Sequence, residues 1–407
     1  MGQNQIVDPK RRYLPSLEGI RGYGFLLVFC GHYFKAELLA QPDTVRLKLL
    51  TAFSSLGLFA VPAFFVLSGY LIGGILFHTR NREGFFKVFY ARRILRVFPV
   101  YYLALLAIAI VYKLQHFPTD SQFWSHFLYI QNLLPGYSTK PTGAVSMVHF
   151  WSLAVEEQFY LIWPLVVWRF RERRKLIAIA TVLVVACCAI RLAAPLLSIS
   201  ALSMSFFTLT RVDAILLGVL LNLTAETAMF RRWMPLAKWV TLCGVVTLAL
   251  LGYFEGIPWS QTYWGKEVWI PLCNLTAVAI VVAVIEEGSV LNRMCSQRWA
   301  CRLGALSYSA YVFHLTFFHF FIYDIGAHLD PYMRRSFAIL TSGALAFCTT
   351  LALSLLSYRF LEGPLMSLKR HMQYGAVNGL NVTAATEKHV SSHLQPVATT
   401  LSSSSQG

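Results

Sequence analysis

Two residues in the first long apolar stretch of the chain, Arg21 and His32, have side chains that can bind anions and move protons. They are eleven residues apart. On a helix this is about 20° beyond three full turns, so both side chains share one face, about 16 Å apart along the axis. Each charge inside a membrane span costs about 2.5–3.5 kcal/mol, which indicates a function or a buried partner. The alternative is an arginine that reaches the membrane surface and a hydrogen-bonded core histidine.

Three arginines, Arg92, Arg93 and Arg96, form a second cluster in the segment FYARRILRVFPVYY. We expect them at the cytosolic start of a helix. Guanidinium groups grip phosphate oxygens through paired hydrogen bonds, so the cluster suits a donor that carries a nucleotide. The alternative is that these charges only set the orientation of the helix in the membrane.

Two adjacent carboxylates, Glu156 and Glu157, follow Trp151 and Ser152 in HFWSLAVEEQFYLIWP. We expect them on the outer side of the membrane, in the same half as His32. A carboxylate there can orient an imidazole or bind sugar hydroxyls. The alternative is that these acids only stabilise the first turn of a helix.

Two later segments place polar side chains inside apolar stretches. Arg211 and Asp213, in TRVDAILLG, lie in mid-span and are not four residues apart, so each needs a partner on another helix. Tyr308, Tyr311 and His314, in LGALSYSAYVFHLTFFH, follow at intervals of three and form one polar stripe on a helix. Hydrogen bonding in the core is the alternative role for the tyrosines.

The composition limits the class of protein that can position these side chains. Of 407 residues, 56% are hydrophobic and 13% are charged, whereas a soluble domain carries roughly 25% charged residues. A soluble enzyme, a disordered protein and a nucleic-acid-binding domain are therefore excluded, although the net charge is +16. The eight cysteines form no CxxC pair, so we expect free thiols and no metal site.

We expect an all-α integral membrane protein, a bundle of about ten transmembrane helices over residues 1–366. A bilayer needs about 20 apolar residues per helix. Lys and Arg concentrate in every second loop, which predicts that both termini are cytosolic. Residues 367–407 form a polar, Ser-rich tail that we expect to be disordered in the cytosol. The expected spans are 20–36, 52–77, 98–113, 152–170, 176–193, 205–223, 236–253, 268–286, 304–323 and 335–358.

Seven of these segments occur in an order that resembles the acyltransferase-3 family of polytopic membrane acyltransferases. They are the Arg21–His32 pair, FFVLSGYLI, RRILRVFP, WSLAVEEQFYLIWP, RVDAILLG, SYSAYVFH and SYRFLEGP. The resemblance runs from about residue 14 to 366. One departure is Gly363, where the family often has Arg. The 407 residues contain no esterase-like domain after the last expected span. If the activity needs such a domain, we expect it on a separate protein.

The resemblance implies transfer of an acyl group, often acetyl, from acyl-CoA to a hydroxyl of a glycan, a lipid-linked sugar or an exopolysaccharide, in a bacterial inner membrane. We expect this acceptor and membrane lipids as partners, and no nucleic acid. A separate partner protein is an alternative that the sequence leaves open. The donor phosphates would lie on Arg21, Arg92, Arg93 and Arg96. No metal is required. A transporter or exporter of a polar or anionic substrate is the alternative, because charges inside spans also mark transport pathways.

In this mechanism His32 is the general base on the acceptor hydroxyl, or itself carries the acyl group. Glu156 or Glu157 holds the imidazole or the sugar, and Arg211 stabilises the oxyanion. We expect the remaining polar side chains to bind substrate, and these are Trp151, Ser152, Asp213, Tyr311 and His314.

Overall fold

The computed structural model describes residues 14–33, 45–117, 119–134, 137, 146–198, 200–254, 262–317, 320–329, 331–332 and 335–375. These residues form helices and their connections, with no β-strand among them. The predicted all-α class is therefore confirmed. Most of the tail that we expect to be disordered lies outside the described residues, beyond Gly375.

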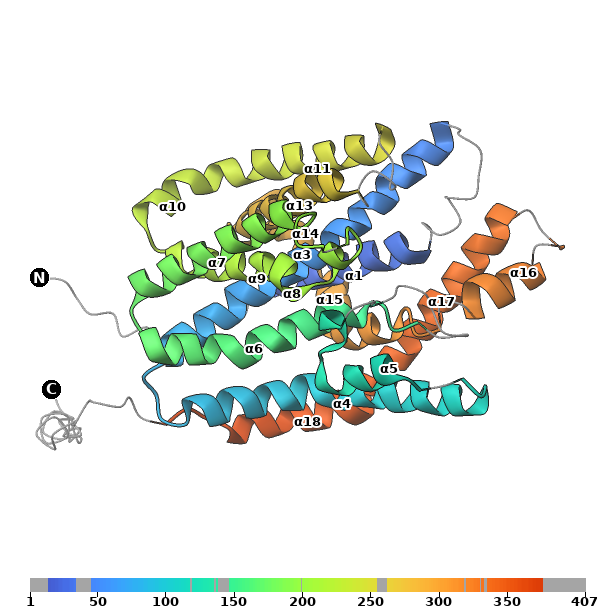
Figure 1. Ribbon diagram of the computed structural model, residues 1–407, viewed down its shortest axis with the longest axis horizontal. Coiled ribbons are helices and arrows are strands. Elements are labelled where there is room, and N and C mark those ends of the chain that lie inside the picture. Colours follow the sequence, from blue (N-terminus) through green and yellow to red (C-terminus); the bar gives the residue numbers. More distant parts are fainter. Residues whose placement is uncertain are drawn as a thin grey trace, which may run out of the picture.

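The long helices form a bundle in which α3 runs through the middle, with α4 and α18 along one edge and α11 along the opposite edge (Figure 1). The longer elements are α1 (Pro15–Tyr33), α3 (Val45–Thr79), α4 (Phe85–Leu114), α6 (Phe150–Phe170), α7 (Arg173–Ala193), α9 (Asp213–Thr224), α11 (Ala237–Phe254), α13 (Tyr263–Ile285), α15 (Arg298–Phe313) and α17 (Arg335–Ser357). Short helices join them: α5 (Ser121–Ser125), α8 (Thr208–Arg211), α10 (Ala228–Trp233), α14 (Val290–Cys295), α16 (Gly326–Leu329) and α18 (Gly363–Ser367).

Six helices among the described residues are long and apolar enough to cross a membrane. They cover Phe59–Thr79, Phe85–Leu114, Arg173–Ala193, Ala228–Phe254, Trp264–Ile285 and Phe337–His371. The chain is thus a multi-pass membrane protein. The length and hydropathy of the described helices support six spans and do not confirm the expected ten. The other four expected spans correspond to α1, α6, α8 with α9, and α15, and these helices are shorter or carry the charged side chains described below.

Two differences between the expected spans and the observed helices affect charged residues. The third span does not begin near residue 98, because α4 starts at Phe85 after the left-handed Gly84. Its arginines therefore lie two to three turns inside the helix. The sixth span is not continuous, since the chain breaks at Val212 between α8 and α9. Arg211 thus ends one short helix and Asp213 begins the next.

Helix α3 occupies the centre because its glycines allow very close approach. It packs against α1, α6, α9, α11 and α13. A Cβ added at Gly69 would lie 1.8 Å from the Ile215 carbonyl oxygen, and one added at Gly218 would lie 2.0 Å from that of Val66. Small residues at such crossings let helix backbones touch in membranes, where the hydrophobic effect does not drive association.

Basic loops that are distant in the sequence meet at one end of the bundle, which we call the basic end. Arg173 pairs with Glu226 at 2.9 Å, and the Gly375 amide donates to the Glu83 carbonyl at 3.1 Å. Partial burial, followed by repulsion from Arg171 and Arg173, lowers the pKa of the Arg80 guanidinium. Loops on the same side of a membrane are expected to carry the same excess of Lys and Arg.

We predict that Gly69→Ala destabilises the bundle by about 1–3 kcal/mol or more, because its methyl group would enter the backbone of α9. Gly73→Ala is the matched control, since its Cβ would meet only the Val219 side chain and Cα, at 3.1 Å or more. The thermal unfolding midpoint in detergent is the measurement. Equal midpoints for wild type and Gly69→Ala would contradict this close helix crossing.

Candidate active site

A cavity between α1, α3, α4, α6 and α15 brings together charged and hydroxyl-bearing side chains in the interior of the bundle. Seven of the residues predicted to act in the site line it: Arg21, Arg93, Arg96, Ser152, Glu156, Glu157 and Tyr311. The other lining residues are Val61, Phe64, Ser68, Val97, Leu153, Tyr160, Ser307 and Tyr308. Five helices that are far apart in the sequence thus contribute to one chamber.

The cations and the carboxylates of this cavity compensate one another. Glu156 accepts a hydrogen bond from Ser68 and interacts electrostatically with Arg93, Arg21 and Arg96. The Arg93 guanidinium also lies over the Tyr160 ring, 5.1 Å from its centroid. Arg21 also pairs with Glu18 of its own helix at 3.4 Å. The cavity lining itself contains three arginines and two carboxylates, so its arginines outnumber its carboxylates.

The depth of the glutamate pair follows from the packing of α6 against α4. Helices α4 and α6 run antiparallel, as shown by the Tyr90 hydroxyl donating to the Leu161 carbonyl at 2.9 Å and by the contact of Tyr101 with Phe150. Arg96 is about 16 Å from the basic end of α4, and Glu157 is about 20 Å from the basic end of α6. The carboxylates thus lie near the middle of the 21-residue helix α6, slightly toward the end that is farther from the basic end, and about 4 Å deeper than Arg96. Their predicted place in the same half of the membrane as His32 stays a prediction.

Ser152 and Tyr311 lie at the end of the cavity that is farther from the basic end. Their hydroxyl oxygens are 2.6 Å apart, and the Tyr311 hydroxyl lies 3.2 Å from the His149 carbonyl oxygen. Both side chains are buried. They form the polar connection between the cavity and the histidines behind it.

His32 and His314 contact each other directly, although they are 282 residues apart in the sequence. The Nε2 atom of His314 lies 3.3 Å from Nδ1 of His32. His314 also bonds the Tyr311 carbonyl oxygen through its Nδ1 at 2.6 Å. The predicted base and one predicted substrate-binding residue therefore form a single unit next to the cavity.

Arg92 points away from the cavity, unlike its two neighbours. Its Nε donates to the Met372 carbonyl at 3.0 Å, and its guanidinium lies 5.4 Å from the centroid of the Tyr374 ring. Lys369, from the same C-terminal segment, interacts electrostatically with Arg96 and Arg93. The basic cluster thus contains a lysine that the sequence analysis did not single out.

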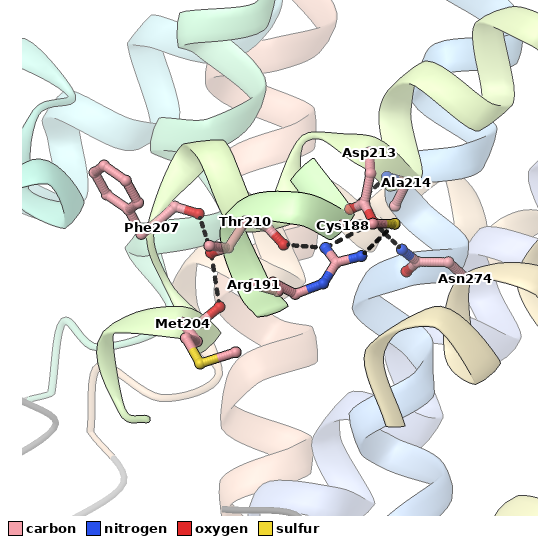
Figure 2. A network of polar contacts seen from close by, with 8 residues as sticks. All are labelled: Cys188, Arg191, Met204, Phe207, Thr210, Asp213, Ala214 and Asn274. Carbon is pink, nitrogen blue, oxygen red and sulfur yellow. Dashed lines mark hydrogen bonds and ion pairs between the residues drawn. The ribbon is translucent and has the colours of Figure 1, made fainter. Parts of the chain in front are cut away.

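Asp213 and Arg211 are not among the residues that line the cavity. Asp213 belongs to a second buried network (Figure 2). The Asp213 carboxylate accepts hydrogen bonds from Arg191 at 2.8 Å and from Asn274 at 2.9 Å. This confirms that Asp213 needs partners on other helices. The Arg191 guanidinium also donates to the Thr210 carbonyl at 2.7 Å. The network joins α7, α8, α9 and α13.

Arg211 and Trp151 contact each other beside this network. The Arg211 guanidinium lies 5.4 Å from the centroid of the Trp151 ring. At this distance the face of the aromatic ring attracts the positive charge. Within the part of the chain that the structure describes, the buried Nε of Arg211 has no hydrogen-bond partner. Their predicted roles in oxyanion stabilisation and substrate binding stay predictions.

Ser68 and Tyr160 are cavity residues that the sequence analysis missed. Their hydroxyl oxygens are in very close contact between α3 and α6. Tyr160 follows Glu156 by four residues, so it lies on the same helix face, and this spacing was the available signal. Among the described residues, no group of three or more potential metal ligands comes together.

We predict that Asp213→Ala costs about 3–5 kcal/mol of stability, because it leaves the Arg191 charge buried without its partner. Their side chains are only 3% and 0% exposed, respectively. Glu226→Ala is the matched control: it breaks the exposed pair with Arg173 and costs at most about 1 kcal/mol. Thermal unfolding of the purified protein measures both. A similar effect of the two substitutions would contradict a stabilising role for the Asp213 network.

Comparison with known proteins places this architecture in a family. The family model described as an acyltransferase domain matches residues 14–359. The chain is 26% identical over 381 residues to YrhL of Bacillus subtilis, which is provisionally named a peptidoglycan O-acetyltransferase. It is 25% identical over 375 residues to the O-acetyltransferase OatA of Staphylococcus aureus.

These alignments cover 87% of the chain but only 55% and 57% of the two relatives. The chain therefore spans a little over half the length of the curated relatives that it matches. No solved structure matches it. Because the family model covers most of its length, the chain belongs to the acyltransferase-3 family.

Proposed function

We propose that the protein is a membrane O-acyltransferase that moves an acyl group, most simply acetyl, from acyl-CoA to a hydroxyl of a glycan. The observation that carries this proposal is the polar column through the bundle: arginines of the cavity, the two glutamates, the Ser152–Tyr311 pair, and then the two histidines. The names of the relatives, which mention O-acetyl transfer and peptidoglycan, support a glycan acceptor.

In this proposal the donor approaches from the basic end, which faces the cytosol. Its phosphates bind Arg93 and Arg96, with Arg21 deeper in the cavity and Lys369 beside them. Arginine and lysine suit this role because their donors match phosphate oxygens. The long pantetheine arm then follows the cavity toward Tyr311, and the thioester reaches the histidines.

At the far end of the cavity, His32 acts as general base. Its imidazole takes the proton of the acceptor hydroxyl, whose oxygen attacks the thioester carbonyl carbon. The tetrahedral intermediate then collapses, the carbon–sulfur bond breaks, and the proton passes to the CoA sulfur. Such a base supplies about 10²–10⁴ in rate. A covalent acyl group on His32 is the other form of this mechanism.

The membrane topology in this proposal defines the side from which each substrate approaches. The shorter helices α1, α6, α8 with α9, and α15 complete about ten spans, and both termini lie in the cytosol of a bacterial cell. Donor and acceptor then meet within the bilayer from opposite sides. Glu156 and Glu157, near the middle, hold the sugar or the passing thioester, while Trp151 and Arg211 lie toward the acceptor side.

We predict that the double variant Arg93→Ala/Arg96→Ala weakens acyl-CoA binding by about ten- to a hundredfold or more, since each charged hydrogen bond contributes about 1.5–3 kcal/mol. His32→Ala should retain binding but lose transfer. Arg173→Ala is the matched control, because it removes an arginine of the basic end that lies outside the cavity. Binding and CoA release are measured with purified protein in nanodiscs.

Two outcomes of that experiment would contradict the proposal. Folded wild-type protein that binds no acyl-CoA would favour the transporter, and substrate flux would then be the relevant activity. Loss of binding in Arg173→Ala equal to that in the double variant would show that the cavity arginines are not the phosphate site.

A further inference from the structure

The hydrogen bonds around His32 and His314 define which ring nitrogen carries a proton. A backbone carbonyl oxygen can only accept a hydrogen bond. His32 Nδ1 lies 2.9 Å from the Val28 carbonyl oxygen, so this nitrogen carries the proton in the neutral ring. His314 Nδ1 lies 2.6 Å from the Tyr311 carbonyl oxygen and carries its proton for the same reason.

These two assignments determine the direction of the contact between the rings. With its proton on Nδ1, neutral His314 presents a lone pair at Nε2, which lies 3.3 Å from the protonated Nδ1 of His32. The His32 N–H is therefore shared between the Val28 carbonyl and His314. The basic lone pair of His32 is then on Nε2, on the opposite side of the ring.

We propose that His314 is the positioning residue of His32: it accepts the Nδ1 hydrogen, holds the ring in the tautomer with a basic Nε2, and stabilises the imidazolium formed during transfer. This inference rests on the proposed acyl transfer. In many acyl-transfer sites the nucleophile is activated by a base, and a third group orients that base. Here the third group is a neutral imidazole in place of a carboxylate, which suits a site within an apolar bundle.

The surroundings of His314 fix its ring firmly enough for this role. The residue is 1% exposed. Its backbone carbonyl accepts a hydrogen bond from the Tyr33 hydroxyl at 2.7 Å, which ties it to the end of α1 just after His32. Its ring packs edge-to-face against Phe25 and His149, with centroids 6.3 and 5.0 Å away.

The proton balance of the step is simple. The acceptor hydroxyl loses its proton to His32 Nε2, and the positive charge that forms is shared with Nδ1–H. That N–H becomes a stronger donor to the Val28 carbonyl and to His314 Nε2. No proton moves to His314, and the proton on His32 Nε2 later passes to the leaving CoA sulfur.

Two amide substitutions test the proposal, because they differ only in reach. The side-chain oxygen of His314→Gln can occupy the position of Nε2 and accept from His32, whereas that of His314→Asn reaches only the position of Nδ1. We expect the Gln variant to keep most of the wild-type kcat. The Asn variant should lose about tenfold to a hundredfold in kcat, a part of what general-base catalysis supplies.

The KM values for donor and acceptor separate positioning from substrate binding. If His314 positions His32, KM should stay within about twofold in both variants. His149→Gln is the matched control, since its amide can still donate to the Val312 carbonyl, as His149 does at 2.9 Å, and it does not bond His32. Elution as a single monodisperse species in detergent shows that each variant is folded.

Equal kcat values for Gln and Asn, or a rise in KM with unchanged kcat, would overturn the positioning role and favour substrate binding by His314. In either case, acyl transfer by the wild-type protein would still support the proposed function. If folded wild-type protein transfers no acyl group, the proposed function fails, and the role of His314 fails with it.

Discussion

The charges inside the bundle are the constraint on which the rest of the structure depends. Each would cost about 2.5–3.5 kcal/mol in a lone membrane helix. Arg21, Arg93 and Arg96 come from α1 and α4, and they meet the carboxylates of Glu156 and Glu157 from α6. Since these helices are far apart in the sequence, compensating the charges requires them to surround one cavity. The close glycine crossings of α3 then let the other helices pack around this group.

The second buried network brings the neighbouring helices together, as the cavity charges do for α1, α4 and α6. Arg191, Asp213 and Asn274 join α7, α9 and α13 through hydrogen bonds of 2.8 and 2.9 Å. A buried pair of this kind adds little stability compared with apolar residues, but it penalises every arrangement that separates the partners. The helices that carry the cavity and the helices beside it are thus each held in register by polar contacts.

Much of the site could be predicted from residue type and spacing, because a charge or histidine in an apolar span is unusual enough to indicate function. The cavity contains Arg21, Arg93 and Arg96 as predicted. The orientation of Arg92 could not be predicted, since it depends on Met372 and Tyr374, about 280 residues later in the chain. The break at Val212 was also missed. It depends on how the helices pack, and hydropathy in one sequence does not contain that information.

In the proposed function, one column of side chains connects a phosphate site to the histidine pair. This arrangement can be tested by a cryo-electron microscopy structure of the protein in nanodiscs with a CoA thioether that cannot transfer its acyl group. We expect phosphate density against Arg93 and Arg96, with the sulfur beyond Tyr311 and next to His32. A ligand bound at the outer surface or between α7 and α13, with the cavity empty, would contradict it.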